Sequence, residues 1–263
     1  MYPILFRIYG LTIYTYGFFV AMGFLAGIYL IKYESRRLGE NPEKILDLAF
    51  YSVLAAIIGA RVFYIATDPS TFLNDPVEII RIWNGGLVFY GGFISVFIVA
   101  IIYIRFHKMK FWQTLDIASP SIAIGHSIGR LGCFFAGCCY GRECHLPWAI
   151  TFTHPESLAP LGVSLHPTQL YASISNLMLF LFLFSIRKRK KFDGQLFCIY
   201  MILYALLRMV NEYFRGDFRG NMGIFSFSPS QSIALVMALI FSLLWFFLWK
   251  RAAKGTKGMN HHA

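Results

Sequence analysis

Long apolar stretches, separated by short polar segments, follow one another along nearly the whole chain. A helix needs roughly 20 mostly apolar residues to cross the hydrocarbon core of a bilayer. Stretches of this kind lie at about 11–31, 47–66, 86–104, 113–135, 168–186, 195–214 and 230–249. The pattern therefore predicts an all-α integral membrane protein with about seven transmembrane helices.

The composition agrees with this class. Of the 263 residues, 57% are hydrophobic and only 14% are charged, whereas a soluble domain carries about 25% charged residues. This shortage of charge argues against a soluble enzyme, a disordered protein and a nucleic-acid-binding module. The first apolar stretch lacks the basic leader of a signal peptide and a clear small-residue cleavage site before Lys32, so we expect it to be retained as a span.

The net charge of +11 is distributed unevenly between the two sides of the predicted bundle. Sixteen of the 24 Lys and Arg residues follow the first, third, fifth and seventh spans, and so lie on one face. Positively charged loops mark the cytoplasmic side of a membrane protein and contact anionic lipids. We therefore expect the N-terminus outside and the C-terminus in the cytoplasm, with membrane lipids as partners and no nucleic acid.

Dense spans and short loops predict a single membrane domain over residues 1–263. The turn signals of 67–85 predict an arm at the outer membrane surface. The longer outer segment 136–167 predicts a small extramembrane head, with a short strand in the run Trp148–Thr153. Residues 250–263 are expected to form a cytoplasmic tail.

Three arginines, Arg61, Arg130 and Arg208, fall within apolar spans. An arginine at the centre of a bilayer costs about 2.5–3.5 kcal/mol on insertion scales, so each is a candidate functional residue. Alternatively, each arginine forms an ion pair inside the protein, or its side chain extends to the membrane–water interface. For Arg61, near the outer end of its span, both interpretations stay open.

Tyr204, Arg208, Glu212 and Arg215 share one stripe of a helix. Glu212 is spaced to pair with either arginine, but one carboxylate cannot neutralise two guanidinium groups. We therefore expect net positive charge near the outer end of the sixth span, which favours an anionic ligand such as phosphate. A salt-bridge ladder that only steadies the helix is the alternative.

Glycines surround two further candidates. Gly125 and Gly129, before Arg130, form a G-x-x-x-G pattern that allows close helix packing, and later glycines, Gly141 among them, loosen the helix as it leaves the membrane. Arg130 beside that break suits a lipid phosphate, with plain glycine packing as the alternative. Tyr90 stands between two Gly-Gly pairs. It marks either a kinked entrance to the third span or a re-entrant wall that presents its hydroxyl to a cavity.

Four cysteines, Cys133, Cys138, Cys139 and Cys144, fall near the outer face, and Cys198 lies within the sixth span. A disulfide among the four stays open, because the outer side of a membrane can be oxidising. Their spacing to the nearby histidines matches no standard zinc pattern, so we expect no metal and buried thiols that fill space.

These motifs together resemble the prolipoprotein diacylglyceryl transferases of bacterial inner membranes. The resemblance covers nearly the whole chain and is strongest from Gly129-Arg130 to Gly141-Arg142. It begins at Tyr14-Thr-Tyr16-Gly17 and ends at Gln231. Three further segments support it: Arg81-Ile-Trp with the Gly-Gly pairs, His166-Pro-Thr-Gln169-Leu-Tyr171, and Tyr204 to Arg215. The chain departs from the best-known pattern at Tyr90, where many members have His, and at Cys133 and Cys138, where Asn and Glu are common. A scheme with His as general base is therefore in doubt, although a Cys-rich signature is familiar in the family.

The resemblance implies transfer of the diacylglyceryl group of phosphatidylglycerol to the lipobox cysteine of a prolipoprotein. It implies no metal or organic cofactor, and an active site on the periplasmic side of the inner membrane. Catalytic roles fall to Arg130, Arg208, Tyr90 and Glu212, and substrate contacts to the two arginines with Tyr16, Gly91, Gly92, Gly141, His166, Gln169, Tyr204 and Arg215.

Three alternatives remain. A lipid phosphatase would need a nucleophile or a carboxylate metal centre, and the outer face offers no carboxylate cluster. An anion or lipid transporter would also use interior arginines and broken helices, but such proteins usually show inverted repeats, and none is found. A catalytically silent binder of prolipoproteins is supported only by the departures at Tyr90, Cys133 and Cys138.

Overall fold

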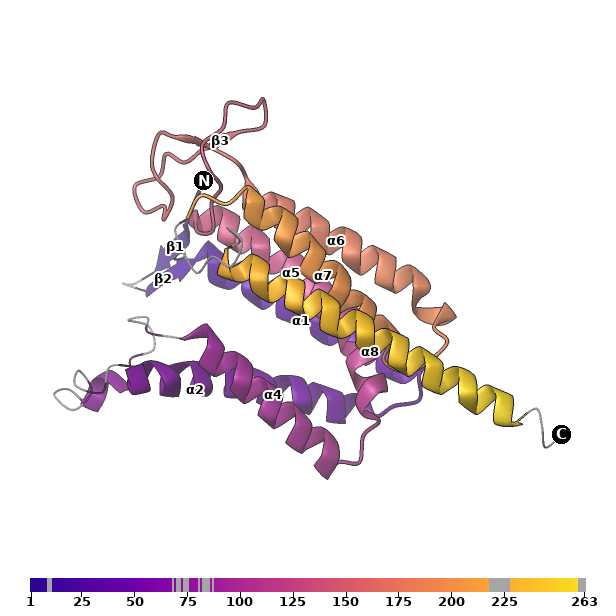
Figure 1. Cartoon of the computed structure of the whole chain (residues 1–263). Coiled ribbons are helices and arrows are strands. Elements are labelled where there is room, and N and C mark those ends of the chain that lie inside the picture. The colour runs from indigo at the N-terminus through magenta and orange to yellow at the C-terminus, as the bar shows by residue number, and fades with distance from the viewer. Residues whose placement is uncertain are drawn as a thin grey trace. The chain divides into compact units, whose positions relative to one another are not determined.

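The computed structural model describes residues 1–8, 11–67, 69, 72, 76–79, 81, 86, 88–217 and 228–259 (Figure 1). Its long helices are α1 (Thr15–Arg37), α2 (Pro42–Thr67), α4 (Phe89–Phe106), α5 (Phe111–Ala136), α6 (Thr168–Ile186), α7 (Gln195–Tyr213) and α8 (Pro229–Met259). Each of the seven predicted spans coincides with one of them. The helical class predicted from the apolar stretches is therefore confirmed.

Among the described residues, five segments are long and apolar enough to cross a membrane: Thr15–Arg37, Pro42–Thr67, Thr168–Arg189, Gln195–Tyr213 and Pro229–Lys254. The segment Thr168–Arg189 joins α6 to the 3-10 helix η3 (Arg187–Arg189). Helix α4 offers only a shorter apolar run, Tyr90–Phe106. The chain is thus a multi-pass membrane protein, and the full count of seven spans remains a prediction.

Helix α5 is long enough to span but carries many polar side chains. Those of Gln113, Asp116, Ser119 and Ser127 are all buried. Asp116 accepts hydrogen bonds from the backbone N–H groups of Gly194 and Phe197, at 2.9 and 3.0 Å, where α7 begins. Packing against neighbouring helices therefore shields the polar residues that lower the hydropathy of α5.

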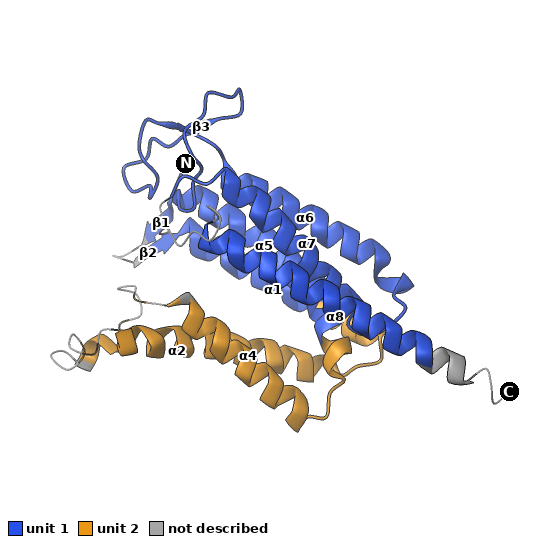
Figure 2. Cartoon of the chain, in the orientation of Figure 1, with its two compact units in different colours: residues 1–30, 115–263 blue, residues 31–114 orange. Residues whose placement is uncertain are grey.

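The chain divides into two compact units (Figure 2). Unit 1 comprises Met1–Leu30 and Leu115–Ala263, and unit 2 comprises Ile31–Thr114. In unit 1, helices α5, α6, α7 and α8 lie side by side (Figure 1). A core that includes Leu179, Leu183 and Tyr200 joins α6 to α7.

Close backbone contact joins α1 to α5 in unit 1. A Cβ atom on Gly23 would lie 2.8 Å from the carbonyl oxygen of Gly125. Gly129, by contrast, has no neighbouring atom within 4 Å of the place where its Cβ would stand. The predicted glycine face is therefore used at Gly125 and not at Gly129.

A hairpin of β1 (Ile4–Ile8) and β2 (Leu11–Tyr14) precedes α1. The prediction that the first span begins near 11 is wrong, since residues 11–14 form a strand. Alternating apolar and Thr or Tyr side chains favour extended backbone there. The strand ends at Tyr14. The N–H and hydroxyl of the next residue, Thr15, donate to the carbonyls of Pro3 and Tyr2, at 2.9 and 2.6 Å.

In the predicted head, β3 (Ile150–Thr151) pairs antiparallel with β4 (Ser164–Leu165). This confirms a strand in the run Trp148–Thr153, although it is shorter than that run. Buried Phe152, Ala159 and Leu165 form a small core beside it. At the other end of the chain, α8 continues to Met259 and so includes most of the predicted tail.

Unit 2 pairs α2 with α4. The glycines Gly59, Gly91 and Gly92 face the partner helix so closely that a Cβ on any of them would overlap it. Arg61 is 6% exposed, and its guanidinium donates to the carbonyls of Glu78, Ile79 and Gly86. Arg61 therefore satisfies loop carbonyls, among them those of the 3-10 helix η1 (Pro76–Ile79). Much of the predicted arm, including Trp83, lies outside the described residues.

Candidate functional site

The strongest motif begins where α5 ends. Helix α5 stops at Ala136, and Gly137 and Cys139 then adopt left-handed backbone, with φ of +78° and +60°. Glycine adopts such angles freely, whereas a cysteine rarely does. This turn directs residues 137–142 across the ends of α6 and α7.

The start of α6 holds this turn from one side. The Thr168 hydroxyl donates to the Cys139 carbonyl at 2.7 Å, and the Gln169 amide donates to the Cys138 carbonyl at 2.8 Å. Both donors are only 1% exposed. The N–H of Gly141 donates to the His166 carbonyl at 3.1 Å. His166 and Gln169, predicted to contact substrate, therefore support the turn, and a substrate contact for them remains a prediction.

The end of α7 holds the same turn from the other side. Gly141 forms a β-bridge with Arg215, and the N–H of Arg142 donates to the Phe214 carbonyl at 2.9 Å. A Cβ on Gly141 would lie 2.5 Å from the Cβ of His166, so only glycine fits there. Three motifs that are far apart in sequence therefore meet at one place.

The predicted charge stripe on α7 is present, but its pairing differs from expectation. Arg208 pairs with Glu212 at 2.9 Å, whereas Arg215 makes two hydrogen bonds to Asp217, at 2.8 and 2.6 Å. Burial alone would lower the pKa of Arg215, but its hydrogen bonds to Asp217 and Cys139 outweigh burial and raise that pKa. Glu212 also lies 3.9 Å from Arg215 Nε, so its predicted reach to both arginines is confirmed. Because Asp217 supplies a second carboxylate, the prediction of a net positive charge from Arg208 and Arg215 is wrong.

The uncompensated positive charge belongs to Arg130. Its Nε donates to His126 Nε2 at 3.1 Å, so this imidazole nitrogen acts as an acceptor. Arg130 makes no ion pair with any residue that the structure describes. The sequence analysis missed His126, although its position four residues before Arg130 places both on one face of α5.

Arg130 and Arg208, from α5 and α7, line one small pocket with His126, Tyr204 and Asn211. The Nη1 atom of Arg208 is buried there without a hydrogen-bond partner. A buried guanidinium donor without a partner is costly, and an oxyanion would satisfy it. The structure thus brings together two of the predicted catalytic arginines in a net positive pocket.

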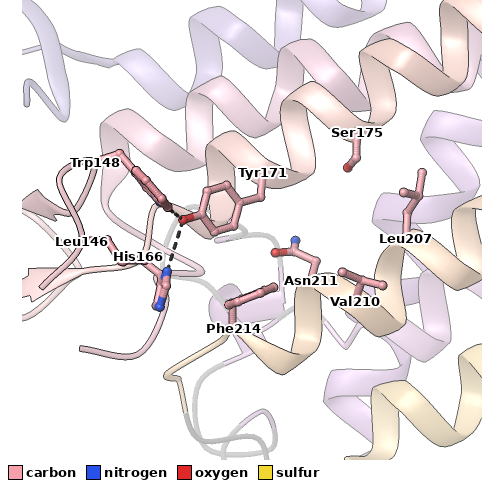
Figure 3. A pocket seen from close by; sticks show the side chains of 9 residues that line it. All are labelled: Leu146, Trp148, His166, Tyr171, Ser175, Leu207, Val210, Asn211 and Phe214. Atoms are coloured by element: carbon pink, nitrogen blue, oxygen red, sulfur yellow. Dashed lines mark hydrogen bonds between the residues drawn. The ribbon is translucent and has the colours of Figure 1, made fainter. Parts of the chain in front are cut away.

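A larger apolar pocket, of about 430 Å³, adjoins this one (Figure 3). It is lined by Leu146, Trp148, His166, Tyr171, Ser175, Leu207, Val210, Asn211 and Phe214. The Tyr171 hydroxyl accepts a hydrogen bond from Trp148 Nε1 at 2.8 Å and lies 3.2 Å from His166 Nδ1, to which it can donate (Figure 3). Ser175, Leu207 and Asn211 line both pockets, which are therefore adjacent.

Tyr16 lies in the first turn of α1, and its backbone is close to Gly132 of α5. It is within electrostatic range of Arg130 and of Cys133, Cys138 and Cys139, which also belong to unit 1. Its predicted contact with substrate remains a prediction.

Tyr90, Gly91 and Gly92 belong to unit 2 and are described within it. Tyr90 lies in the first turn of α4, and its side chain is 57% exposed. The two glycines pack against Ala56, Gly59 and Phe63 of α2. Their predicted places at the substrate remain predictions.

All five cysteines, each within the described part of the chain, are thiols in the structure. Hydrogen bonds from neighbouring sulfurs, and then the charge and hydrogen bond of Arg215, lower the pKa of Cys139. The same sulfur contacts raise the pKa of Cys138. One thiolate in this cluster is therefore favoured over two.

These features define a class: a multi-pass membrane protein with a positive pocket, adjacent to an apolar one, suited to an amphiphilic anion. Comparison with known proteins makes the assignment more specific. The sequence profile of the prolipoprotein diacylglyceryl transferase family matches residues 3–247, and the chain belongs to this family.

Relatives agree with this profile. The chain is 36% identical over 241 residues to the phosphatidylglycerol–prolipoprotein diacylglyceryl transferase of Clostridium tetani, covering 92% of this chain and 96% of the relative. It is 37% identical over 235 residues to the enzyme of that name from Finegoldia magna, covering 89% and 91%. It is 32% identical over 259 residues to the one from Synechocystis, covering 95% and 90%. The resemblance drawn from the motifs is thus confirmed.

Proposed function

We propose that the chain transfers the diacylglyceryl group of phosphatidylglycerol to the lipobox cysteine thiol of prolipoproteins. The reaction forms a thioether, releases glycerol phosphate and is the first step of bacterial lipoprotein maturation. The observation that carries the proposal is the pocket shared by Arg130 and Arg208, which is adjacent to an apolar pocket of about 430 Å³.

Arg130 and Arg208 bind the phosphate of the lipid and stabilise the negative charge of the leaving group. Arg208 has a buried Nη1 donor without a partner, and Arg130 has no carboxylate partner among the described residues. Preorganised donors aimed at developing charge commonly contribute about 10²–10³ in rate for each donor. Two guanidinium groups therefore suit the slow step, in which a C–O bond to phosphate breaks.

Neighbouring groups position these arginines. Glu212 fixes Arg208 through the 2.9 Å ion pair, and His126 fixes Arg130 through its ring nitrogen. Arg215, whose charge Asp217 offsets, forms the β-bridge with Gly141 and is a candidate substrate contact. Tyr16 is a candidate hydrogen-bond donor to the lipid head group. From the sequence resemblance alone, Tyr90 is a second such candidate and a candidate relay for the thiol proton.

The apolar pocket binds the part of a lipid acyl chain that lies closest to the reacting phosphate. Its lining is mainly Leu, Val, Phe and Trp side chains, and Asn211 faces both pockets. If the charged group of an amphiphile binds the two arginines, its hydrocarbon chain can occupy the adjacent apolar pocket and so stay out of contact with water.

The location follows from the charge distribution. The basic loops place the N-terminus outside and the C-terminus in the cytoplasm. The turn at 137–142 follows the fourth predicted span and so lies on the outer side. We therefore assign the enzyme to the bacterial inner membrane, with about seven spans and an active site toward the periplasm.

A release assay tests the proposed reaction. Detergent-purified full-length protein is mixed with phosphatidylglycerol and a lipobox peptide, and free glycerol phosphate is measured. We expect release only with the cysteine peptide and none with its Cys→Ser form. Equal release with both peptides would indicate a lipid phosphodiesterase, and no release from folded protein would contradict transfer.

A further inference from the structure

Three cysteines that the sequence spacing did not connect form a compact cluster. The Sγ atoms of Cys133, Cys138 and Cys139 all lie within 4.8 Å of one another, and the side chains are half-buried. Three sulfurs bound to one tetrahedral zinc ion lie about 3.8 Å apart, given Zn–S bonds of about 2.3 Å. The cluster therefore needs only a small contraction to bind such an ion.

The backbone holds this cluster in place. Cys133 lies in the last turns of α5, and the left-handed turn at Gly137 and Cys139 returns the other two sulfurs toward it. The carbonyls of Cys138 and Cys139 are fixed by the buried donors Gln169 and Thr168. Side chains that are held before binding lose little entropy when a ligand arrives.

Positive charge surrounds the cluster. The Arg215 guanidinium hydrogen-bonds the Cys139 sulfur, and Arg130 lies within electrostatic range of Cys133. A divalent ion with three thiolates carries one excess negative charge, which Arg130 compensates because Arg215 is already paired with Asp217. N–H donors to coordinating sulfurs are also the usual outer partners of metal sites.

The number of ligands indicates the kind of metal site. Among the described residues, no fourth His, Cys, Asp or Glu joins the three cysteines within the same reach. Structural zinc sites use four protein ligands, whereas catalytic ones use three and leave a fourth position for water or substrate. Three thiolates also favour a soft ion such as zinc over magnesium or calcium.

We propose that Cys133, Cys138 and Cys139 bind a zinc-class thiophilic ion whose fourth position is taken by the lipobox thiol of the substrate. This inference rests on the proposed function. On coordination the thiol loses its proton to water. The bound sulfur then attacks the glyceryl carbon: a C–S bond forms, the C–O bond to phosphate breaks, and its electron pair stays on the phosphate oxygen. Arg130 and Arg208 stabilise that charge, and no oxidant or reductant is consumed.

Metal content tests the site itself. Full-length protein, purified in detergent with reductant, is loaded with zinc and desalted, and zinc is counted by elemental mass spectrometry. We expect roughly one ion per chain. Cys133→Ser, Cys138→Ser and Cys139→Ser should each lose most of it, whereas the matched controls Cys144→Ser and Cys198→Ser should keep it. The absence of bound zinc in the parent protein would overturn the proposal. So would a protein mass lower by two hydrogen atoms, which would indicate a disulfide that the reductant does not open.

Cobalt tests the fourth position. Co²⁺ in a thiolate site gives sulfur-to-metal charge-transfer bands and ligand-field bands that report coordination. We expect the ligand-field bands of the cobalt protein to shift with the cysteine lipobox peptide and not with the serine peptide. Unchanged bands with both would overturn the substrate position. Transfer by thoroughly chelated, metal-free protein would refute the metal while leaving the transferase intact, so the two proposals fail separately.

Discussion

Asp217 holds the guanidinium of Arg215 through two hydrogen bonds, of 2.8 and 2.6 Å. With Glu212 paired to Arg208, each of these arginines has its own carboxylate. The excess charge of the site therefore resides on Arg130 of α5, which only a neutral imidazole contacts among the described residues. The site consists of two positioned ion pairs and one available cation.

Removing either arginine of the shared pocket should nearly abolish transfer. Arg130→Ala and Arg208→Ala each delete a donor to the leaving phosphate, so we expect kcat to fall by about 10²-fold or more. Arg208→Lys should recover little, because an ammonium lacks the planar fork. Initial rates of peptide lipidation measure this, with melting temperature in detergent as the control for folding. Near-normal rates in both alanine variants would refute the phosphate assignment.

The pair of Arg215 and Asp217 should matter for stability. The Arg215 side chain is 3% exposed, so Asp217→Asn leaves a buried guanidinium short of its partner. Losing one member of a buried pair costs about 3–5 kcal/mol, and the partial exposure of Asp217 should reduce this. The double variant Asp217→Asn/Arg215→Met should regain part of the loss in thermal melting. Additive losses would mean that the two residues do not interact.

Two glycines of the signature segment should respond oppositely to alanine. Gly141→Ala places a methyl group against His166 and should lower stability by about 1–3 kcal/mol. Gly129→Ala meets open space within a helix and should keep or raise stability by up to about 1 kcal/mol. Thermal melting compares them directly. Equal destabilisation by both would contradict the close approach at Gly141.

Filling the apolar pocket should affect long acyl chains selectively. Val210→Trp places an indole in the pocket, so the KM for long-chain phosphatidylglycerol should rise several-fold, while a short-chain analogue is affected less. The matched control is Val236→Trp, an exposed position of α8 outside this pocket. The same change in KM for both lipids would argue against an acyl site here.

The helices could be predicted because apolar length is a strong signal. Each apolar stretch coincides with one of the long helices. This holds even for α5, whose polar side chains lower its hydropathy but are buried against neighbouring helices. The hairpin of β1 and β2 was missed because Leu11–Tyr14 is apolar enough to extend a span. The division into two units has no counterpart in the sequence pattern, which predicts a single membrane domain.

The arrangement of site residues could be predicted from sequence where they lie on a single helix. The stripe of Tyr204, Arg208 and Glu212 follows directly from helical spacing. Asp217 lies beyond the end of α7, where that spacing no longer applies, so its pairing with Arg215 could not be foreseen. The cysteine cluster depends on left-handed backbone at Cys139, a conformation that residue type does not predict.

The most direct test is the mass of a lipobox peptide after incubation with phosphatidylglycerol and the purified full-length protein. We expect an added diacylglyceryl group on the cysteine peptide, none on the serine peptide, and almost none with Arg130→Ala. An unmodified cysteine peptide after incubation with folded wild-type protein would contradict the proposed transfer reaction. So would full modification by the Arg130→Ala variant.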